Sequence, residues 1–253
     1  MPDTAGIIEL KKISATLASR CKTLRFSGKV KAIYNPLDYA KRPHNKYLEL
    51  AGANQKKVIF LGMNPGPWGM AQTGVPFGEI PAVRDWLGIN EKVDKPTQEH
   101  PKRLIEGFNC ERSEVSGKRL WGFFSDRYKT PKDFFKDHYV ANYCPLIFMD
   151  ENGANITPDK LIHGEKITLF EFCDRALEQT IILLKPKWVI GIGGFAKMRI
   201  DTVCDKMREE NRDSFFKSIK TGQILHPSPA NPRANKGWEE EVLKKLKDLG
   251  VWP

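Results

Sequence analysis

The stretch that decides the fold is KVIFLG, residues 57–62, which runs directly into GMNPGPWGMAQTGVPFG, residues 62–78. The first part is almost continuously apolar, which is typical of a β-strand that is covered on both faces. The second part has five glycines and three prolines among its seventeen residues, a composition that predicts a loop. The loop also carries Trp68 and Phe77, two large apolar side chains that are normally buried. We therefore expect the loop to have a role besides connecting two elements.

Three further apolar segments are predicted to be buried strands, at residues 138–148, 187–193 and 218–226. Helical patterns lie between the later strands, at residues 165–184 and 195–210. Strands that alternate with helices indicate a parallel sheet with right-handed crossovers. The expected fold class is therefore α/β, with a central, mainly parallel four-stranded sheet.

Helices are also predicted near both ends of the chain. Apolar residues recur at helical spacing over residues 7–24, and a second apolar stripe over residues 237–250 ends on a glycine, a natural helix stop. Between the first helix and the first core strand, residues 31–40 are interrupted by Pro36. No segment has the composition of a linker, so we expect a single domain over residues 1–253.

The charge of the chain indicates a polyanionic partner. The formal net charge is +10 and the isoelectric point is about 9.3, and a surplus of this size is most often associated with nucleic acid. Charge alone does not distinguish a protein that binds a polyanion from one that is merely basic.

The spacing of cysteine and histidine predicts no metal site. The five cysteines form no C-x-x-C pair and the five histidines show no ligand spacing, so zinc ribbons and iron–sulfur clusters are disfavoured. Several of the cysteines lie in apolar runs and are interpreted as reduced core residues of a cytosolic protein. We find no signal peptide and no apolar run of membrane-spanning length.

Polar residues follow the predicted strands at three places. Asn64 comes just after the first strand, Asn142 lies within the second, and His226 begins the segment after the fourth. In sheets of this class, ligands bind beyond the carboxyl ends of the strands, where the strand order reverses. We therefore expect these three side chains to share one site.

The same stretches resemble the single-strand-selective monofunctional uracil-DNA glycosylase family. Residues 62–79 are similar to its first motif, and HPSPANPRANKGW, residues 226–238, is similar to its second. Other segments fit the family in the same order: YNPLDYA (34–40), VRDWLGI (83–89), SEVSGKRLWGFF (113–124) and NYCPL (142–146). The resemblance spans residues 24–250 and implies a three-layer α/β/α uracil-DNA glycosylase fold, base excision from DNA, and neither cofactor nor metal.

The resemblance implies that three residues hold the base. Phe77 would stack on uracil, and Met63 would donate its backbone N–H to it. Asn142 would pair with O4 and N3–H of uracil through its amide, whereas cytosine presents the opposite pattern and would leave buried groups unpaired. Without the resemblance, Phe77 and Met63 would be interpreted as core residues. The alternative for Asn142 is a sheet-edge asparagine that is bonded to nearby backbone.

Two residues are candidates for the chemical step. Asn64 would position the attacking water, since an amide cannot remove a proton. His226 would donate a hydrogen bond near O2 of uracil and stabilise the negative charge of the leaving base, which a neutral imidazole can do. The alternatives are a turn asparagine in the NPG sequence and a loop histidine before Pro227. No lysine or N-terminal proline stands in a nucleophile's place, so an enzyme without lyase activity is expected.

Contacts with DNA are expected from two segments: Asn155 and Thr157 in the loop 152–160, then Ser228, Ala230, Arg233 and Lys236 in the second motif. Lys236 is expected at a backbone phosphate. Ala230 stands where vertebrate-type members of the family are expected to have an arginine that fills the gap left by the flipped base. Either Arg233 replaces that wedge or the wedge is weaker here. The loop 152–160 is equally well explained as a polar connection.

Gly66 is expected to set selectivity at C5 of the base. Related uracil-DNA glycosylases of another family have a tyrosine at this loop position, packed against C5, whereas glycine leaves a small void for water or a polar substituent. The resemblance therefore predicts activity on uracil and 5-hydroxymethyluracil, with thymine a poor substrate.

The expected protein is a monomeric glycosylase that acts on single- and double-stranded DNA and leaves an abasic site. It would be cytoplasmic in a bacterium or nuclear in a eukaryote. The alternatives are a non-catalytic binder of single-stranded DNA, a hydrolase of free nucleosides, and a glycosylase with its main activity on another deaminated base. Pure binding would need neither Asn64 nor His226, and the basic surplus disfavours a nucleoside hydrolase.

Overall fold

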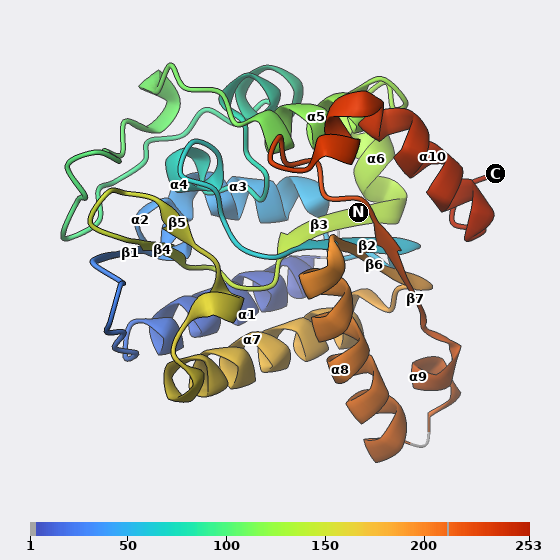
Figure 1. Ribbon diagram of the computed structural model, residues 1–253. Helices are drawn as coiled ribbons and strands as arrows, with labels where there is room; N and C mark the ends of the chain where they lie inside the picture. The colour runs from blue at the N-terminus through green and yellow to red at the C-terminus, as the bar shows by residue number, and fades with distance from the viewer. Residues whose placement is uncertain (1–3, 212) are drawn as a thin grey trace.

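The computed structural model describes residues 4–211 and 213–253. Its centre is a sheet with the strand order β3-β2-β6-β7, in which each neighbouring pair is parallel (Figure 1). The strands are β2 (Val58–Gly62), β3 (His138–Asn142), β6 (Trp188–Ile192) and β7 (Lys220–Ile224). Each of the four predicted segments contributes a strand to one parallel sheet, so the α/β fold class is confirmed.

Helices cover both faces of this sheet and complete the predicted three layers (Figure 1). One face carries α1 (Thr4–Cys21), α7 (His163–Leu184) and α8 (Gly194–Glu210). The other face carries α3 (Lys41–Ala51), α5 (Val115–Ser125), α6 (Pro131–Asp137) and α10 (Trp238–Asp248). Shorter helices are α2 (Pro36–Tyr39), α4 (Met70–Thr73) and α9 (Ser214–Ser218). The helix predicted at residues 7–24 is α1, which begins and ends three residues earlier.

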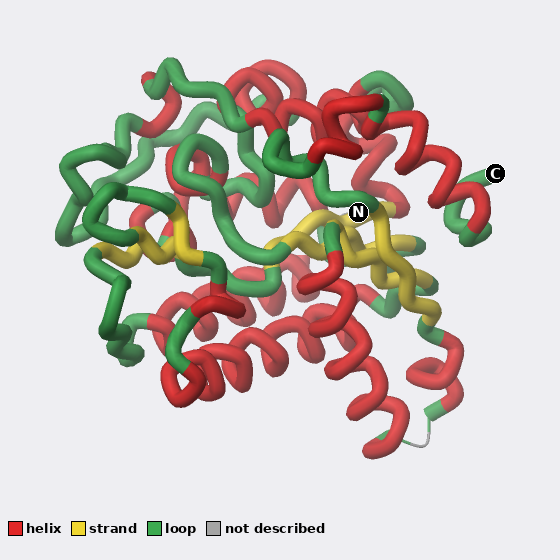
Figure 2. The backbone as a smooth tube through the Cα atoms, viewed as in Figure 1, coloured by secondary structure: helices red, strands yellow, loops and turns green. Residues whose placement is uncertain are grey.

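A second, small antiparallel sheet was not predicted. Its order is β1-β4-β5, formed by β1 (Ala32–Tyr34), β4 (Ile147–Met149) and β5 (Asn155–Ile156) (Figure 2). The prediction of one strand over residues 138–148 is therefore wrong. The chain leaves the central sheet after Asn142, and Pro145 lacks the backbone N–H that a ladder needs. The apolar residues beyond it pair with β1 instead.

The core lies on both sides of β2, all five residues of which are buried. Cys21, Cys110, Cys144, Cys173 and Cys204 are buried and unpaired, which agrees with their interpretation as reduced core residues. In the described part of the chain, no helix is long and apolar enough to cross a membrane.

The strand order reverses between β2 and β6. From β2 the chain passes to the layer that contains α5 and α6, whereas from β6 it passes to α8 on the opposite face (Figure 1). Gly193 makes this second turn with a φ of 92°, a conformation that favours glycine. A crevice at the carboxyl ends of β2 and β6 is where sheets of this class bind ligands.

Candidate active site

Three segments meet at the carboxyl end of β2: the loop over residues 63–78, the end of β3, and the segment that follows β7. Gly62 and Asn142 are partners in the parallel ladder. At the other side, the backbone N–H of Gly193 donates to the carbonyl of Ile224 at 2.9 Å. The positions of the site residues are therefore fixed by the register of the sheet.

Gly62 leaves the space in which two of the predicted base-binding residues meet. A Cβ atom at this position would lie 2.5 Å from Asn142 Oδ1 and 2.6 Å from two carbons of the Phe77 ring. The ring and the amide therefore lie side by side over the end of β2. Phe77 is 7% exposed and has a φ of 52°, which is unfavourable for a residue other than glycine. The loop thus holds the ring in place against a local preference.

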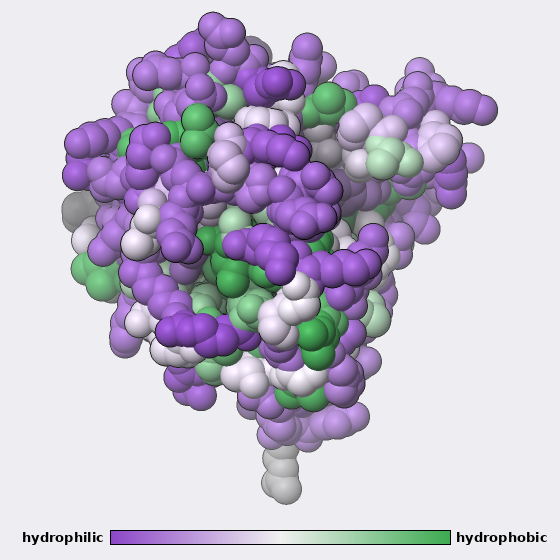
Figure 3. Space-filling model, turned by 60° about the vertical axis from the view of Figure 1, so that its left-hand side comes forward, coloured by the Kyte–Doolittle hydropathy of each residue, from purple (hydrophilic) through white to green (hydrophobic). Residues whose placement is uncertain are grey.

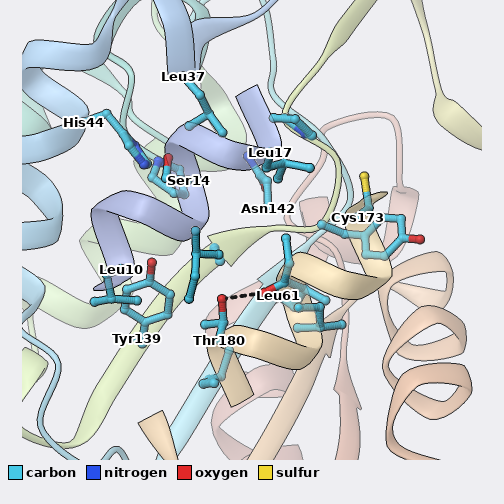
Figure 4. Close-up of a pocket in the computed structure, with 18 of the residues that line it drawn as sticks. Leu10, Ser14, Leu17, Leu37, His44, Leu61, Tyr139, Asn142, Cys173 and Thr180 are labelled. Carbon is cyan, nitrogen blue, oxygen red and sulfur yellow. Dashed lines mark hydrogen bonds between the residues drawn. The ribbon is translucent and has the colours of Figure 1, made fainter. Parts of the chain in front are cut away.

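The amide of Asn142 is only half satisfied. Its Nδ2 donates to the Met70 sulfur at 3.3 Å, and its buried Oδ1 has no partner among the described residues. Asn142 also borders a cavity of about 80 Å³ that is lined largely by apolar side chains (Figure 4). A buried acceptor without a donor costs about 1–3 kcal/mol. A ligand that offers an N–H to this oxygen would remove that cost.

His226 is a neutral hydrogen-bond donor beside the Phe77 ring. The two ring centroids are 6.2 Å apart. The Ser228 backbone N–H donates to His226 Nδ1 at 3.1 Å, which places the imidazole proton on Nε2. Burial lowers the pKa of His226 from 6.5 to about 4, because the charged form loses its hydration. At neutral pH the ring therefore carries one N–H and no charge.

Asn64 and Met63 continue the line of β2 into the loop. Asn64 Nδ2 donates to the Leu146 carbonyl at 3.2 Å, and no described residue donates to its Oδ1, which leaves that oxygen able to accept a hydrogen bond from water. The carbonyl of Met63 accepts from the backbone N–H of Cys144 at 2.9 Å. The segment after β3 thus holds both residues at the strand end.

Gly66 does not face a void on the side where a side chain would project. A Cβ atom at position 66 would lie 2.0 Å from Glu114 Oε1, and one at Gly69 would lie 2.0 Å from Glu114 Oε2. The carboxyl group of Glu114 therefore occupies the space that the sequence predicted to be empty. The prediction could not include it, because Glu114 reaches the loop from the start of α5, 48 residues further along the chain.

Glu114 is one of two neighbouring carboxyl groups with different surroundings. Burial and, to a smaller extent, the charge of Glu79 together raise the pKa of Glu114 to about 7. Glu79 accepts hydrogen bonds from the Ser113 hydroxyl and from the backbone N–H of Ala82, each at 3.1 Å. Glu114 Oε2 is buried and has no partner among the described residues. Glu114 thus retains its proton more readily than a glutamate in water.

The second motif forms a loop that is anchored to α5. Arg119 donates to the Pro227 carbonyl and to Asn235 Oδ1, each at 2.9 Å. The Asn235 amide in turn donates to the Pro229 carbonyl at 2.9 Å. Arg119 is a functional candidate that the sequence reasoning did not identify, although it lies in one of the family-like segments. The only indication in the sequence is its position directly after SEVSGK, and this position does not show which residues Arg119 contacts.

The predicted DNA-contacting residues of this loop lie at the surface. Ala230, Arg233 and Lys236 are exposed and Ser228 is half-buried. Arg233 forms an ion pair with Glu241 of α10 at 2.7 Å. Its guanidinium is therefore directed toward α10 in this structure, although it is the residue that was expected to replace the wedge.

Asn155 and Thr157 belong to a different part of the molecule. Asn155 pairs with Met149 in the small antiparallel sheet and is exposed, and Thr157 is half-buried. Neither residue contacts Phe77, Asn142 or His226, so the structure does not bring them into this group. Both remain predictions as DNA contacts.

The face that contains the strand ends is hollowed and mixed in character. In the view of Figure 3, hydrophobic side chains line a hollow that hydrophilic side chains surround. No group of three or more His, Cys, Asp or Glu residues within residues 4–211 and 213–253 could hold a metal ion. The groups gathered at the strand ends are amides, one imidazole and one aromatic ring, with one carboxyl group behind the loop.

This fold and this site define a class of base-excising enzymes. The family model of the uracil DNA glycosylase superfamily matches residues 51–247. The chain also resembles the crystal structure of wild-type Pedobacter heparinus SMUG2, with a TM-score of 0.60 and 17% identity over 95% of this chain and 99% of that chain. At this identity the likeness supports the fold alone.

Curated relatives are much more similar. The single-strand selective monofunctional uracil-DNA glycosylases of Rattus norvegicus, Bos taurus and Mus musculus are each 44% identical to this chain over 237 residues. The matches cover 94% of this chain and 82%, 84% and 82% of those proteins, respectively. The chain belongs to the single-strand selective monofunctional uracil-DNA glycosylase family.

The unpaired amide oxygen predicts an effect on stability. Asn142→Leu should raise the free energy of unfolding by about 1 kcal/mol, because it removes a buried acceptor that has no donor. Urea denaturation measures this change. Asn54→Leu is the control and should lower stability, since Asn54 accepts from Lys56 Nζ at 2.8 Å and donates to the Lys136 carbonyl at 2.9 Å. A clear loss of stability in Asn142→Leu would mean that the amide is satisfied in solution.

The half-buried imidazole of His226 is predicted to have a shifted titration. An NMR titration should give His226 a midpoint near 4 and the Nε2–H tautomer at neutral pH. Because the folded-state pKa is lowered, the stabilising contribution is complete above 6.5 and is lost as the pH falls through about 4. His226→Gln identifies the resonance. A midpoint near 6.5 would contradict the burial of the ring.

Proposed function

We propose that this protein removes uracil from DNA by hydrolysing the N-glycosidic bond to deoxyribose, and that it leaves an abasic site. The observation that carries the proposal is the half-satisfied Asn142 amide. It lies beside the Phe77 ring because Gly62 has no side chain to separate the two groups. The relatives' names, which state uracil, DNA and single-strand selectivity, support the same substrate. We expect action on single strands and, more weakly, on duplexes.

The amide of Asn142 suits uracil and not cytosine. Its unpaired Oδ1 would accept the N3–H of uracil, and its Nδ2, now bonded to the weak thioether acceptor of Met70, would turn to O4. Cytosine presents an acceptor at N3 and a donor at C4, so both contacts would be lost. Each polar group left unpaired in the closed pocket costs about 1–3 kcal/mol. The Phe77 ring would stack on either base and therefore supplies affinity without this discrimination.

His226 would act on the leaving group. Uracil departs with negative charge on O2, and a fixed N–H aimed at that oxygen stabilises the charge as it develops. With Nδ1 occupied by the Ser228 N–H, the Nε2–H is the group available for this task. The ring needs no proton from solvent, because its neutral form is already the donor.

Asn64 would hold the water that attacks the sugar. Its Nδ2 is engaged by the Leu146 carbonyl, so the orientation of the amide is fixed with Oδ1 available as an acceptor. An oxocarbenium-like sugar can be captured by a weakly activated water. Positioning by Asn64 is therefore sufficient, and no general base is needed in the loop.

The second motif supports a preference for single strands. Extrusion of a base from a duplex costs a few kcal/mol and costs less in a single strand. Ala230 is too short to fill the gap in a duplex, and Arg233 is engaged with Glu241. A wedge of this kind would compensate poorly for unstacking, while the net charge of +10 still provides attraction to phosphates.

A uracil-containing single-stranded oligonucleotide tests the activity. In the presence of EDTA, the protein should produce alkali-labile sites and no strand breaks before alkali treatment. Asn64→Ala and His226→Leu should each lower the single-turnover rate about 10²–10³-fold while DNA binding is retained. Binding without any alkali-labile site would favour a single-stranded DNA-binding protein, and release of another deaminated base in preference to uracil would favour a glycosylase of different specificity.

We further propose that 5-hydroxymethyluracil is a second substrate, because Gly66 brings no side chain of its own to C5. Gly66→Ala should lower the release of 5-hydroxymethyluracil at least tenfold more than that of uracil. Its Cβ would meet the Glu114 carboxyl group, which Gly69 and Gly117 confine, so the loop must yield toward the base. Gly122→Ala, whose Cβ would meet nothing within 4 Å, is the control. Equal losses on both bases in single-turnover assays would contradict a role at C5.

A further inference from the structure

Two arginines from a distant segment lie over the ring of Trp68, in the loop that follows β2. The guanidinium carbons of Arg103 and Arg112 are 5.0 Å and 5.3 Å from the centroid of this ring. Trp68 is half-buried, and its indole N–H, unlike that of Trp121 or Trp238, makes no hydrogen bond within the described residues. The face of an indole ring attracts cations, so Trp68 holds two positive charges close together.

No carboxylate neutralises this pair of charges. In the described part of the chain, neither guanidinium forms an ion pair, and the acidic residues Glu106 and Glu111 of the same segment are not bonded to them. Arg103 donates from Nη1 to the Lys102 carbonyl at 2.8 Å, and its buried Nε has no partner. The Arg112 side chain is exposed. Two like charges that are held together without a counter-charge favour the binding of an anion.

The segment that carries Arg103 is fixed to the loop by a buried glutamine. The side-chain amide of Gln72, which is 0% exposed, donates to the Pro67 carbonyl at 3.2 Å and to the Leu104 carbonyl at 3.0 Å. These bonds join the residue before Trp68 to the residue after Arg103. The contact between the guanidinium and the ring therefore rests on a fixed backbone, so little ordering is needed when a ligand binds.

Trp68 is close to the base pocket. Two residues after it, Met70 accepts the hydrogen bond of the Asn142 amide at 3.3 Å. Successive Cα atoms are about 3.8 Å apart, so the Cα atoms of Trp68 and Met70 lie within about 8 Å of each other. A DNA strand whose uracil is paired with Asn142 would therefore have its flanking part within reach of the ring and its two arginines.

On another side, the two arginines adjoin the loop 152–160, for which contacts with DNA were predicted. A Cβ atom at Gly153 would lie 3.2 Å from Arg103 Cγ. Lys102 Nζ donates to Asn152 Oδ1 at 3.3 Å, and both of these residues are exposed. Cationic and amide donors thus follow one another from the loop after β2 to the loop 152–160, as the binding of an extended strand requires.

We propose that Trp68, Arg103 and Arg112 form a binding site for phosphate groups of the DNA strand beside the flipped nucleotide. The inference rests on the proposed function and deepens it, because it names a surface that holds the strand. A guanidinium donates to two phosphate oxygens at once, and stacking on the indole ring orients it without using those donors. Phosphates are the same in every sequence, so the site adds affinity and does not select the base.

The test measures binding of a single-stranded oligonucleotide without uracil over a range of salt concentrations. The wild type is compared with Arg103→Gln, Arg112→Gln, the double variant, Trp68→Leu and Arg20→Gln. Arg20 is the matched control, because its guanidinium also lies over an aromatic ring, that of Phe172 at 5.4 Å. It lines a groove together with acidic residues of α7, which would repel DNA. Arg20→Gln thus removes the same charge and the same kind of ring contact away from the proposed site.

Each phosphate that is neutralised contributes about −0.7 to the slope of log K against log salt for a single strand. The slope should therefore be about 0.7 less steep in Arg103→Gln and in Arg112→Gln, and about 1.4 less steep in the double variant. Arg20→Gln should keep the wild-type slope. Trp68→Leu keeps both charges and should weaken binding about threefold, because the guanidinium groups are no longer held on a ring.

A slope in Arg112→Gln equal to that of Arg20→Gln would overturn the site, as would wild-type binding in Trp68→Leu. The Arg112 side chain makes no hydrogen bond with a described residue, so Arg112→Gln should keep the melting temperature of the wild type. The same preparations are then assayed on a uracil-containing strand. Failure of the wild type to release uracil would overturn the proposed function, whatever the slopes are, so the two failures are distinguishable.

Discussion

A side chain at position 62 would occupy the space in which the Phe77 ring and the Asn142 amide meet. This steric constraint at the end of β2 places the aromatic face and the polar edge of the pocket in contact, although they come from segments 65 residues apart. The register of β2 with β3 then fixes the amide, and the ring fixes the distance to His226. The remaining site residues are arranged around the contact between the Phe77 ring and the Asn142 amide.

The pocket is polar but nearly uncharged, and burial is the common cause. Loss of hydration lowers the pKa of His226 to about 4, and loss of hydration together with the charge of Glu79 raises that of Glu114 to about 7, so in both groups burial shifts the equilibrium toward the neutral form. A neutral lining suits a neutral base. It also leaves the charge that develops on the departing base to be met by fixed donors rather than by ions that water would screen. The two unpaired oxygens, Asn142 Oδ1 and Glu114 Oε2, have no donor among the described residues and therefore lower the stability of the free protein.

The central sheet and the residues at its strand ends could be predicted from the sequence, because both follow from local patterns. Apolar runs located the four strands, and Asn64, Asn142 and His226 follow from their positions after or within those runs. The small antiparallel sheet was missed because its three strands are only two or three residues long, too short for periodicity to show. Glu114 and Arg119 were missed for a different reason. Their importance lies in contacts with Gly66 and Pro227, and contacts between distant segments have no local pattern.

The glycine content of the loop after β2 is explained by close packing rather than by mobility. Of its five glycines, Gly74 is the one with a left-handed φ, of 70°. A Cβ atom at Gly62, Gly66, Gly69 or Gly78 would lie within 2.5 Å of a neighbouring atom in each case. The space of each missing side chain is therefore filled by another group: the Asn142 amide and the Phe77 ring, the Glu114 carboxyl group, or the Thr73 hydroxyl. A loop of this kind is rigid before the base arrives, so that little binding free energy is spent on ordering it and more remains for extruding the nucleotide.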